Sequence, residues 1–323
     1  MQSYLETTKD VYKAAALTPD VGLCCTTTPV WQLPELSIPK KMLEMNYGCG
    51  STVNPRDLVN NPTILYVGIG GGMELLQFSY FNRKKNGVIG VDVVDEMLTV
   101  CKENLVVAEQ ENKWFDKEFV DVRKGNALAL PIENETIDVA AQNCLFNIFT
   151  HEDLKKALAE MFRVLKPYGR LVLSDPVCEQ AMPENLKNDE TLRALCLSGS
   201  LPLDEYLAML TDAGFGTIEV RAKRAYRILS PNHYETKENI FIESVEVCAI
   251  KDPMPVDGPC IFTGKSAIYY GIEECFDDNA GHVLMPNQPL AVCDKTAEAL
   301  SNLDRDDIYI SESTFFYDGG GCC

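Results

Sequence analysis

Short apolar runs alternate with longer amphipathic stretches through the middle of the chain. The runs are rich in Val, Ile and Leu, as buried strands are, and apolar residues recur with helical spacing between them. We expect strands at 63–67, 87–92, 118–123, 136–142 and 170–174, and helices at 73–82, 94–111 and 152–165. This alternation predicts an α/β fold with a mostly parallel, doubly wound sheet, because parallel neighbours need a crossover between them.

The residues outside these strands and helices carry less regular patterns. We predict a turn at 166–169 and further helices at 8–17, 39–45, 183–197, 203–213 and 296–303. Late strands at 217–221 and 240–250 are expected to pair antiparallel at one edge of the sheet. A stretch rich in Pro, Gly and Asp at 251–259 marks a boundary. The predicted domains are an N-terminal cap segment (1–60), a main domain (61–250) with an insert at about 176–235, and a small cysteine-containing C-terminal module (251–323).

Charge and composition narrow the classes of partner. The formal net charge of −19 repels phosphate backbones and anionic lipid, so we expect no nucleic-acid or membrane partner. No apolar run approaches membrane-spanning length, and no basic head precedes an apolar stretch at the N-terminus, so we expect a cytoplasmic protein. The 13 cysteines are then expected as thiols, and only three histidines argue against a His-based metal site or general base.

A glycine-rich loop joins the first predicted strand to its helix. Gly68, Gly70 and Gly72 allow a sharp turn and a close approach of the backbone to a ligand, although dinucleotide-binding enzymes use similar loops. Asp92 ends the second strand, where a carboxylate can accept both ribose hydroxyls; the alternative is a cap for the next helix. Asn126 follows the third strand and is either an adenine contact or an ordinary turn residue.

The order of these elements resembles that of class I S-adenosylmethionine-dependent methyltransferases. The run Phe-Arg-Val-Leu-Lys-Pro-Tyr-Gly-Arg at 162–170 is similar to the sequence before the fifth strand in small-molecule members. The resemblance implies a Rossmann-like sheet, S-adenosylmethionine as cofactor and a lid inserted after the fifth strand. The cofactor-binding residues it implies are Gly68, Gly70, Gly72, Asp92, Asn126, Ala127 and Asn143. The chain departs from the family at Tyr66, where an acid is usual, and Glu74 is a candidate to replace that acid.

Cysteines occupy the positions that should face the transferred methyl group. Cys144 follows the fourth strand, at the carboxyl edge where ligands of doubly wound sheets bind. A thiol suits a soft, thiophilic acceptor better than a quinone or an amine. Cys24-Cys25, Cys49 in a Tyr-Gly-Cys-Gly turn and Cys196 in the insert also have distinctive settings.

The joint spacing of these cysteines resembles that of the arsenite methyltransferases, and most closely the microbial form found beside arsenosugar-synthesis enzymes. Cys49, Cys144 and Cys196 match the family's essential cysteines, and either Cys24 or Cys25 matches the N-terminal one. The resemblance implies that thiolates hold arsenite, or its thiol conjugates, while the arsenic lone pair attacks the sulfonium methyl without a general base. A disulfide among the cysteines would restore the arsenic oxidation state, and thioredoxin or glutathione would reset the thiols.

The remaining cysteines have simpler interpretations. Cys101, Cys178 and Cys248 are expected in the core, and Cys260, Cys275 and Cys293 lack the paired spacing of a zinc site. The terminal Cys322-Cys323, on a glycine tether, is either a second arsenite-capturing pair or a tail without function.

Two other functions fit parts of this pattern. One is a methyltransferase for an organic acceptor such as a quinone or phenol, with the cysteines as packing residues. The other is a non-catalytic, metalloid-binding thiol protein on a methyltransferase fold, which the unusual Tyr66 favours.

Overall fold

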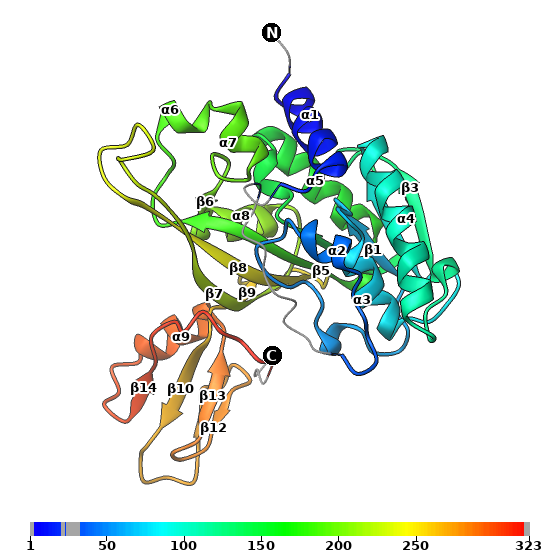
Figure 1. The fold of residues 1–323 in the computed structure, drawn as a ribbon. Coiled ribbons are helices and arrows are strands. Elements are labelled where there is room, and N and C mark those ends of the chain that lie inside the picture. Colours follow the sequence, from blue (N-terminus) through cyan, green and yellow to red (C-terminus); the bar gives the residue numbers. More distant parts are fainter. Residues whose placement is uncertain (1–2, 21–22, 24–32, 320–323) are drawn as a thin grey trace.

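The computed structural model describes residues 3–20, 23 and 33–319 of the chain. In this part the main sheet has nine strands, and its first half is parallel in the order β3-β2-β1-β4-β5 (Figure 1). These strands are β1 (Ile64–Val67), β2 (Val88–Asp92), β3 (Val120–Lys124), β4 (Ile137–Asn143) and β5 (Leu165–Cys178). The predicted mostly parallel, doubly wound sheet is confirmed, since β1 lies at the centre with crossovers to both sides.

The second half of the sheet extends it beyond β5. β8 (Ile240–Ile250) pairs antiparallel with β5 and with β7 (Thr217–Leu229), and β9 (Cys260–Phe262) pairs parallel with β7. β6 (Leu201–Pro202) pairs with the end of β5. The predicted antiparallel pair is therefore present, but β8 lies between β5 and β7 rather than at an edge.

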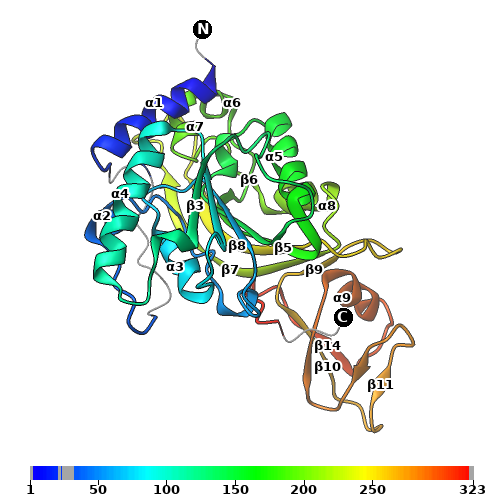
Figure 2. The same ribbon diagram turned by 90° about the vertical axis from the view of Figure 1, so that its right-hand side faces the viewer.

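Helices cover both faces of the sheet, and β1 shows why. Leu65 and Val67 point to the face covered by α5 (His151–Val164) and α8 (Leu203–Asp212), in one apolar core. Ile64 and Tyr66 point to the opposite face, which packs against α2 (Lys40–Glu44), α3 (Met73–Phe81) and α4 (Asp95–Glu111). Figure 2 shows the two helical layers from the side, with α1 (Tyr4–Leu17) beside α4.

Two local predictions were wrong. The helix expected at 183–197 is two short helices, α6 (Glu184–Lys187) and α7 (Glu190–Ala194), because the Asp189 carboxylate accepts from the Leu192 N–H and begins a new helix. The turn expected at 166–169 lies inside β5, where the pairing with β4 shifts register and Tyr168 has φ = 63°.

Residues 260–319 combine β9 of the main sheet with a small separate module (Figure 1). Its sheet contains β10 (Lys265–Tyr269), β13 (Pro289–Val292) and β14 (Ile308–Ile310), packed on α9 (Asp294–Ser301), with a hairpin of β11 (Phe276–Asp277) and β12 (Val283–Leu284). The described part of the chain also contains three short 3-10 helices: η1 (Pro55–Asp57), η2 (Lys117–Phe119) and η3 (Phe146–Ile148). Among the described residues, no helix combines the length and apolarity needed to cross a bilayer.

Candidate active site

A cavity opens at the carboxyl ends of the parallel strands, where doubly wound sheets bind their ligands. Its walls come from the loops after β1, β2, β3 and β4, together with α1 and the segment before Cys49. The predicted residues on these walls are Gly68, Gly70, Asp92, Asn126, Ala127, Asn143 and Cys144. The described residues of the wall include no histidine, which leaves the cavity without an imidazole base.

The glycine loop follows β1 without a break. Gly68 and Gly70 adopt φ values of 80° and 50°, in the left-handed region that favours glycine. Gly72 does not line the cavity; it is the residue before α3, with φ = 89°. A Cβ atom at Gly72 would lie 2.8 Å from the Cys101 Sγ, so this glycine allows α3 and α4 to pack closely.

Asp92 faces the cavity from the end of β2. Its carboxylate accepts hydrogen bonds from the Ile69 and Val94 N–H groups, at 3.0 and 2.9 Å. Burial raises the pKa of Asp92 to about 6 because the charged form loses water. The carboxylate thus ties the glycine loop to the residue that precedes α4; it does not cap the helix, because the N-cap is Val94 and these hydrogen bonds do not reach the first turn.

Asn126, like Asp92, makes a local hydrogen bond and also lines the cavity. Its side-chain oxygen accepts from the Leu128 N–H at 3.0 Å, which is a local turn contact, and the residue also lines the cavity beside Gly125 and Ala127.

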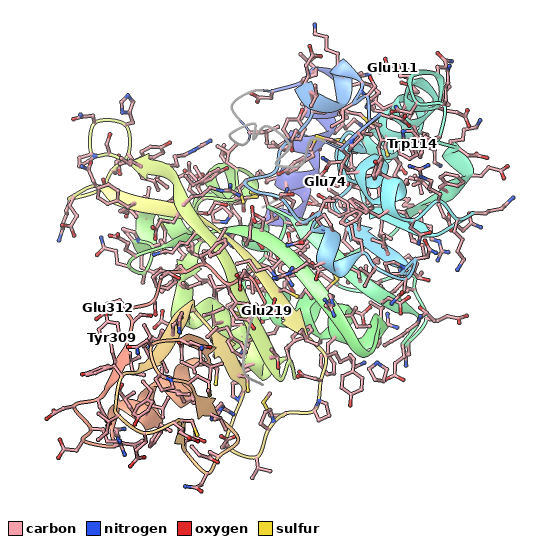
Figure 3. All side chains as sticks on the ribbon, turned by 90° about the horizontal axis from the view of Figure 1, so that it is seen from below. Glu74, Glu111, Trp114, Glu219, Tyr309 and Glu312 are labelled. Carbon is pink, nitrogen blue, oxygen red and sulfur yellow. The ribbon has the colours of Figure 1, made fainter. Side chains whose placement is uncertain are left out.

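The unusual Tyr66 has a carboxyl partner. Its hydroxyl hydrogen-bonds to Glu74, the second residue of α3, and both side chains line the cavity. Burial raises the pKa of Glu74, which also accepts from the Asn143 amide at 3.1 Å. Figure 3 shows Glu74 inside the molecule, whereas Glu111 lies at its outer edge. An acidic side chain, absent at position 66 of β1, is thus present in the first turn of α3 as Glu74.

Asn143 joins the cavity to the turn that carries Cys49. Its side-chain oxygen accepts from the Cys49 N–H at 3.0 Å, and its amide donates to the Gly50 carbonyl at 2.9 Å. A Cβ atom on Gly48 would clash with this side chain, so only glycine lets the turn approach so closely. The end of β4 therefore holds the Cys49 turn directly.

Cys144 and Cys196 lie next to one another, although 52 residues separate them in the chain. The Cys196 thiol donates to the Cys144 carbonyl at 2.7 Å. Both residues adopt left-handed backbone, with φ values of 61° and 59°, which is strained for a side chain other than glycine. Ser174 links them to Cys49: its carbonyl accepts from the Cys144 N–H at 2.7 Å, and its hydroxyl lies 3.4 Å from the Cys49 Sγ.

The structure thus brings Cys49, Cys144 and Cys196 into one buried cluster with Leu23. Each of the three is at most 3% exposed. Among the described residues, no three His, Cys, Asp or Glu side chains are arranged to hold a metal ion, so joint coordination requires side-chain rotation. Cys24, Cys25, Cys322 and Cys323 lie outside the described residues.

The other predicted core cysteines are buried away from this cluster. Burial raises the pKa of the Cys101 and Cys248 thiols well above the ordinary value, and that of Cys178 to about 12. Such thiols stay protonated and behave as packing residues.

Helix α1 forms a wall that we did not predict as part of the site. Leu5, Thr8, Lys9 and Tyr12 line the cavity. Tyr4 donates to Asp153 of α5, Thr7 donates to Glu190 of α7 at 2.6 Å, and Lys13 pairs with Glu96 of α4 at 2.9 Å. The amphipathic pattern of α1 predicts a helix with a buried face but not the surface that it covers.

Comparisons with known proteins agree with this architecture. A family model described as a methyltransferase domain matches residues 58–228, which is more than half of the chain, so the chain belongs to this family. Arsenite methyltransferases are among its relatives: the Halobacterium salinarum protein is 28% identical over 180 residues (56% of this chain, 44% of the relative). The Mus musculus protein is 31% identical over 172 residues (52% and 44%). The chain thus spans about half the length of these relatives, and the predicted resemblance to arsenite methyltransferases is confirmed.

A solved structure matches most of the fold. It is CrArsM, an arsenic(III) S-adenosylmethionine methyltransferase from Chlamydomonas reinhardtii, with a TM-score of 0.58 over 90% of this chain and 99% of that chain. The identity of 19% restricts this likeness to the fold.

Proposed function

We propose that the protein transfers a methyl group from S-adenosylmethionine to trivalent arsenic held by the thiolates of Cys49, Cys144 and Cys196. One observation carries the proposal: three cysteines from separate segments meet in a buried cluster, and Cys144 also lines the cavity. Thiolates are the ligands that a soft metalloid prefers. The similarity to arsenite methyltransferases supports the same acceptor.

The polar groups of the cavity fit S-adenosylmethionine. Asp92 lies where a carboxylate can accept the ribose hydroxyls, and Asn126 is placed after β3 to contact the adenine. Glu74 offers a buried carboxyl for the ammonium of the methionine end, which would favour its ionised form. When bound, the cofactor supplies an electrophilic methyl group on a positively charged sulfur.

The chain's own contribution is to hold the acceptor and exclude water. Asn143 fixes the Cys49 turn, and Ser174 fixes the backbone of Cys144, so the thiols stay next to the cavity. Arsenic bound by thiolates carries no proton to remove, which agrees with a cavity wall without histidine. Catalysis would then depend on positioning.

Thiol reduction completes the proposal. Each methyl transfer raises the arsenic oxidation state by two, from trivalent to pentavalent. Oxidation of two thiols to a disulfide that includes Cys24 or Cys25 would return two electrons to the arsenic, and thioredoxin or glutathione would then reduce the disulfide. Arsenite or its thiol conjugate is the proposed substrate.

Arsenic speciation tests the proposal. Purified protein with arsenite, S-adenosylmethionine and a thiol reductant should yield methylated arsenicals. Cys144→Ser and Cys196→Ser should lose at least about 100-fold in rate, as expected for misplaced reacting groups. Cys275→Ser, a partly exposed cysteine of the C-terminal module, should keep the native rate.

The same assay separates the alternatives. Full activity of Cys144→Ser and Cys196→Ser would contradict the thiolate mechanism. Methylation of a quinone or phenol without arsenite would favour an organic acceptor. Calorimetry that shows no binding of S-adenosylmethionine would favour a non-catalytic thiol protein.

A further inference from the structure

A second pair of buried cysteines lies where β9 of the main sheet meets the C-terminal module. Cys260 begins β9 and is 8% exposed, and Cys293 directly precedes α9 and is fully buried. Neither residue belongs to the cluster beside the cavity. Figure 3 shows this module, with Tyr309 and Glu312 labelled, on the opposite side of the view from Glu74.

Contacts on both sides of Cys260 hold it against the first turn of α9. Before it, the Lys295 ammonium donates to the Gly258 carbonyl at 2.8 Å and to the Asp257 carboxylate at 2.7 Å. After it, the Thr263 hydroxyl donates to the Asp294 carboxylate at 2.7 Å. Asp294 and Lys295 directly follow Cys293, so these hydrogen bonds align the segment of Cys260 with that of Cys293.

The surroundings of the two thiols are mostly apolar and aromatic, with one polar contact between the Cys293 Sγ and the Thr296 hydroxyl at 3.2 Å. Cys260, Cys293, Phe262 and Tyr317 form one small buried cluster. The Phe262 and Tyr317 rings stack, with centroids 4.7 Å apart and an interplanar angle of 28°. The Lys295 ammonium is a nearby cation, because Lys295 lies two residues after Cys293 and donates to the carbonyl of Gly258, two residues before Cys260. The cluster thus combines two thiols, an aromatic wall and one positive charge.

This composition matches one class of ligand. Trivalent arsenic with one carbon substituent has two further valences, so it can form two As–S bonds and place its methyl or aryl group against an apolar surface. Binding R–As(OH)₂ to two thiols forms two As–S bonds and releases two waters, each taking one thiol proton, with no change in oxidation state. Inorganic arsenite has three such valences and is better suited to three thiols.

We propose that Cys260 and Cys293 form a second thiol site that binds monosubstituted organoarsenicals in the trivalent state. The site itself follows from the cluster alone, and only the source of a methylated ligand rests on the proposed function. The product of one methyl transfer would be such a ligand.

Phenylarsine oxide is the probe that tests this site, because it bridges two thiols and releases one water. The full-length protein, treated with one equivalent and digested with trypsin, should contain peptides 252–265 and 266–295 joined by a phenylarsenic bridge. Cys275 lies in the second of these peptides, so Cys275→Ser is the matched control and should keep the bridge. Cys260→Ser and Cys293→Ser should each lose it, with at least about a tenfold loss of affinity at this site.

Two outcomes would overturn the proposal. The first is that the native protein forms no phenylarsenic bridge between the two peptides. The second is that this bridge persists in Cys260→Ser or disappears in Cys275→Ser.

Arsenite methylation by the same variants separates this proposal from the proposed function. Cys260→Ser and Cys293→Ser should methylate arsenite at the native initial rate while losing the bridge. A native protein that forms the bridge but does not methylate arsenite would retain the second site and contradict the proposed function alone.

Discussion

Replacing Asn143 by alanine should damage arsenite methylation far more than its loss of stability explains. The side chain satisfies the Cys49 N–H and the Gly50 carbonyl, and it donates to Glu74. Each buried backbone group left without a partner costs about 1–3 kcal/mol. We expect the free energy of unfolding to fall by about 3 kcal/mol, somewhat less where cavity water replaces the amide.

The activity should fall for a different reason. Asn143→Ala removes the two hydrogen bonds from β4 to the Cys49 turn and leaves the one that Ser244 of β8 donates to the Cys49 carbonyl. A displacement of about 1 Å near reacting atoms can cost about 100-fold in rate. The loss of the amide donor should also raise the pKa of Glu74 further, because that hydrogen bond favours the ionised carboxyl.

Asn112 provides a matched control far from the cavity. Like Asn143, Asn112 is buried and its side chain makes three hydrogen bonds, here all to backbone groups. It accepts from the Ser37 N–H at 2.7 Å and donates to the Ser37 and Ala108 carbonyls at 2.8 and 2.9 Å. Asn112→Ala should lose similar stability in urea unfolding followed by circular dichroism. Initial rates of arsenite methylation at saturating cofactor should fall only in Asn143→Ala. Equal rates in the two variants would refute the assigned role of Asn143.

Two further predictions concern the carboxyls of the cavity. Folding raises the pKa of Asp92 from 3.8 to about 6. The folded protein therefore binds the Asp92 proton more tightly than the unfolded chain does, and protonation stabilises the fold. This stabilisation is complete below about pH 4 and is lost as the pH rises through 6. Asp92→Asn removes this titration and keeps one of the two acceptor oxygens, so the stability of the native protein relative to the variant should rise as the pH falls from 7 to 4, by at most about 3 kcal/mol, and the variant should bind S-adenosylmethionine at least tenfold more weakly; a difference in urea midpoints that does not change with pH would contradict the desolvation argument. Glu74→Gln should raise the Kd of S-adenosylmethionine about tenfold in calorimetry, because it removes the negative charge opposite the ammonium of the cofactor. Glu111→Gln at the surface should leave this Kd unchanged. An unaltered Kd in Glu74→Gln would exclude Glu74 as the partner of the ammonium.

Most of the parallel sheet could be predicted because its pattern is local. The strands β1, β2 and β4 are short apolar runs bounded by glycine or polar residues, and the helices between them repeat every three to four residues. Such periodicity depends only on neighbouring residues. The rule of right-handed crossovers restricts the possible topologies, and the structure supplies the order β3-β2-β1-β4-β5.

The predictions failed where a single side chain or a distant partner decided the outcome. Asp189 divided the expected helix at 183–197 by accepting from the Leu192 N–H, although the apolar pattern runs through the break. The late strands pair as predicted, but the sequence did not say which of them is the inner strand; β8 lies between β5 and β7, and the short β9 follows outside β7. The cavity wall from α1 likewise depends on tertiary packing and was not predicted.

The sequence by itself determined the fold class, the glycine loop with Asp92 at the next strand end, and the set of cysteines worth considering. Only the tertiary structure decided which cysteines meet. It grouped Cys49, Cys144 and Cys196 in one buried cluster, and it placed Cys260 and Cys293 in another, although these cysteines have no common spacing in the chain. The physical reason is that periodicity records which face of an element is buried, whereas the convergence of side chains depends on how distant elements pack.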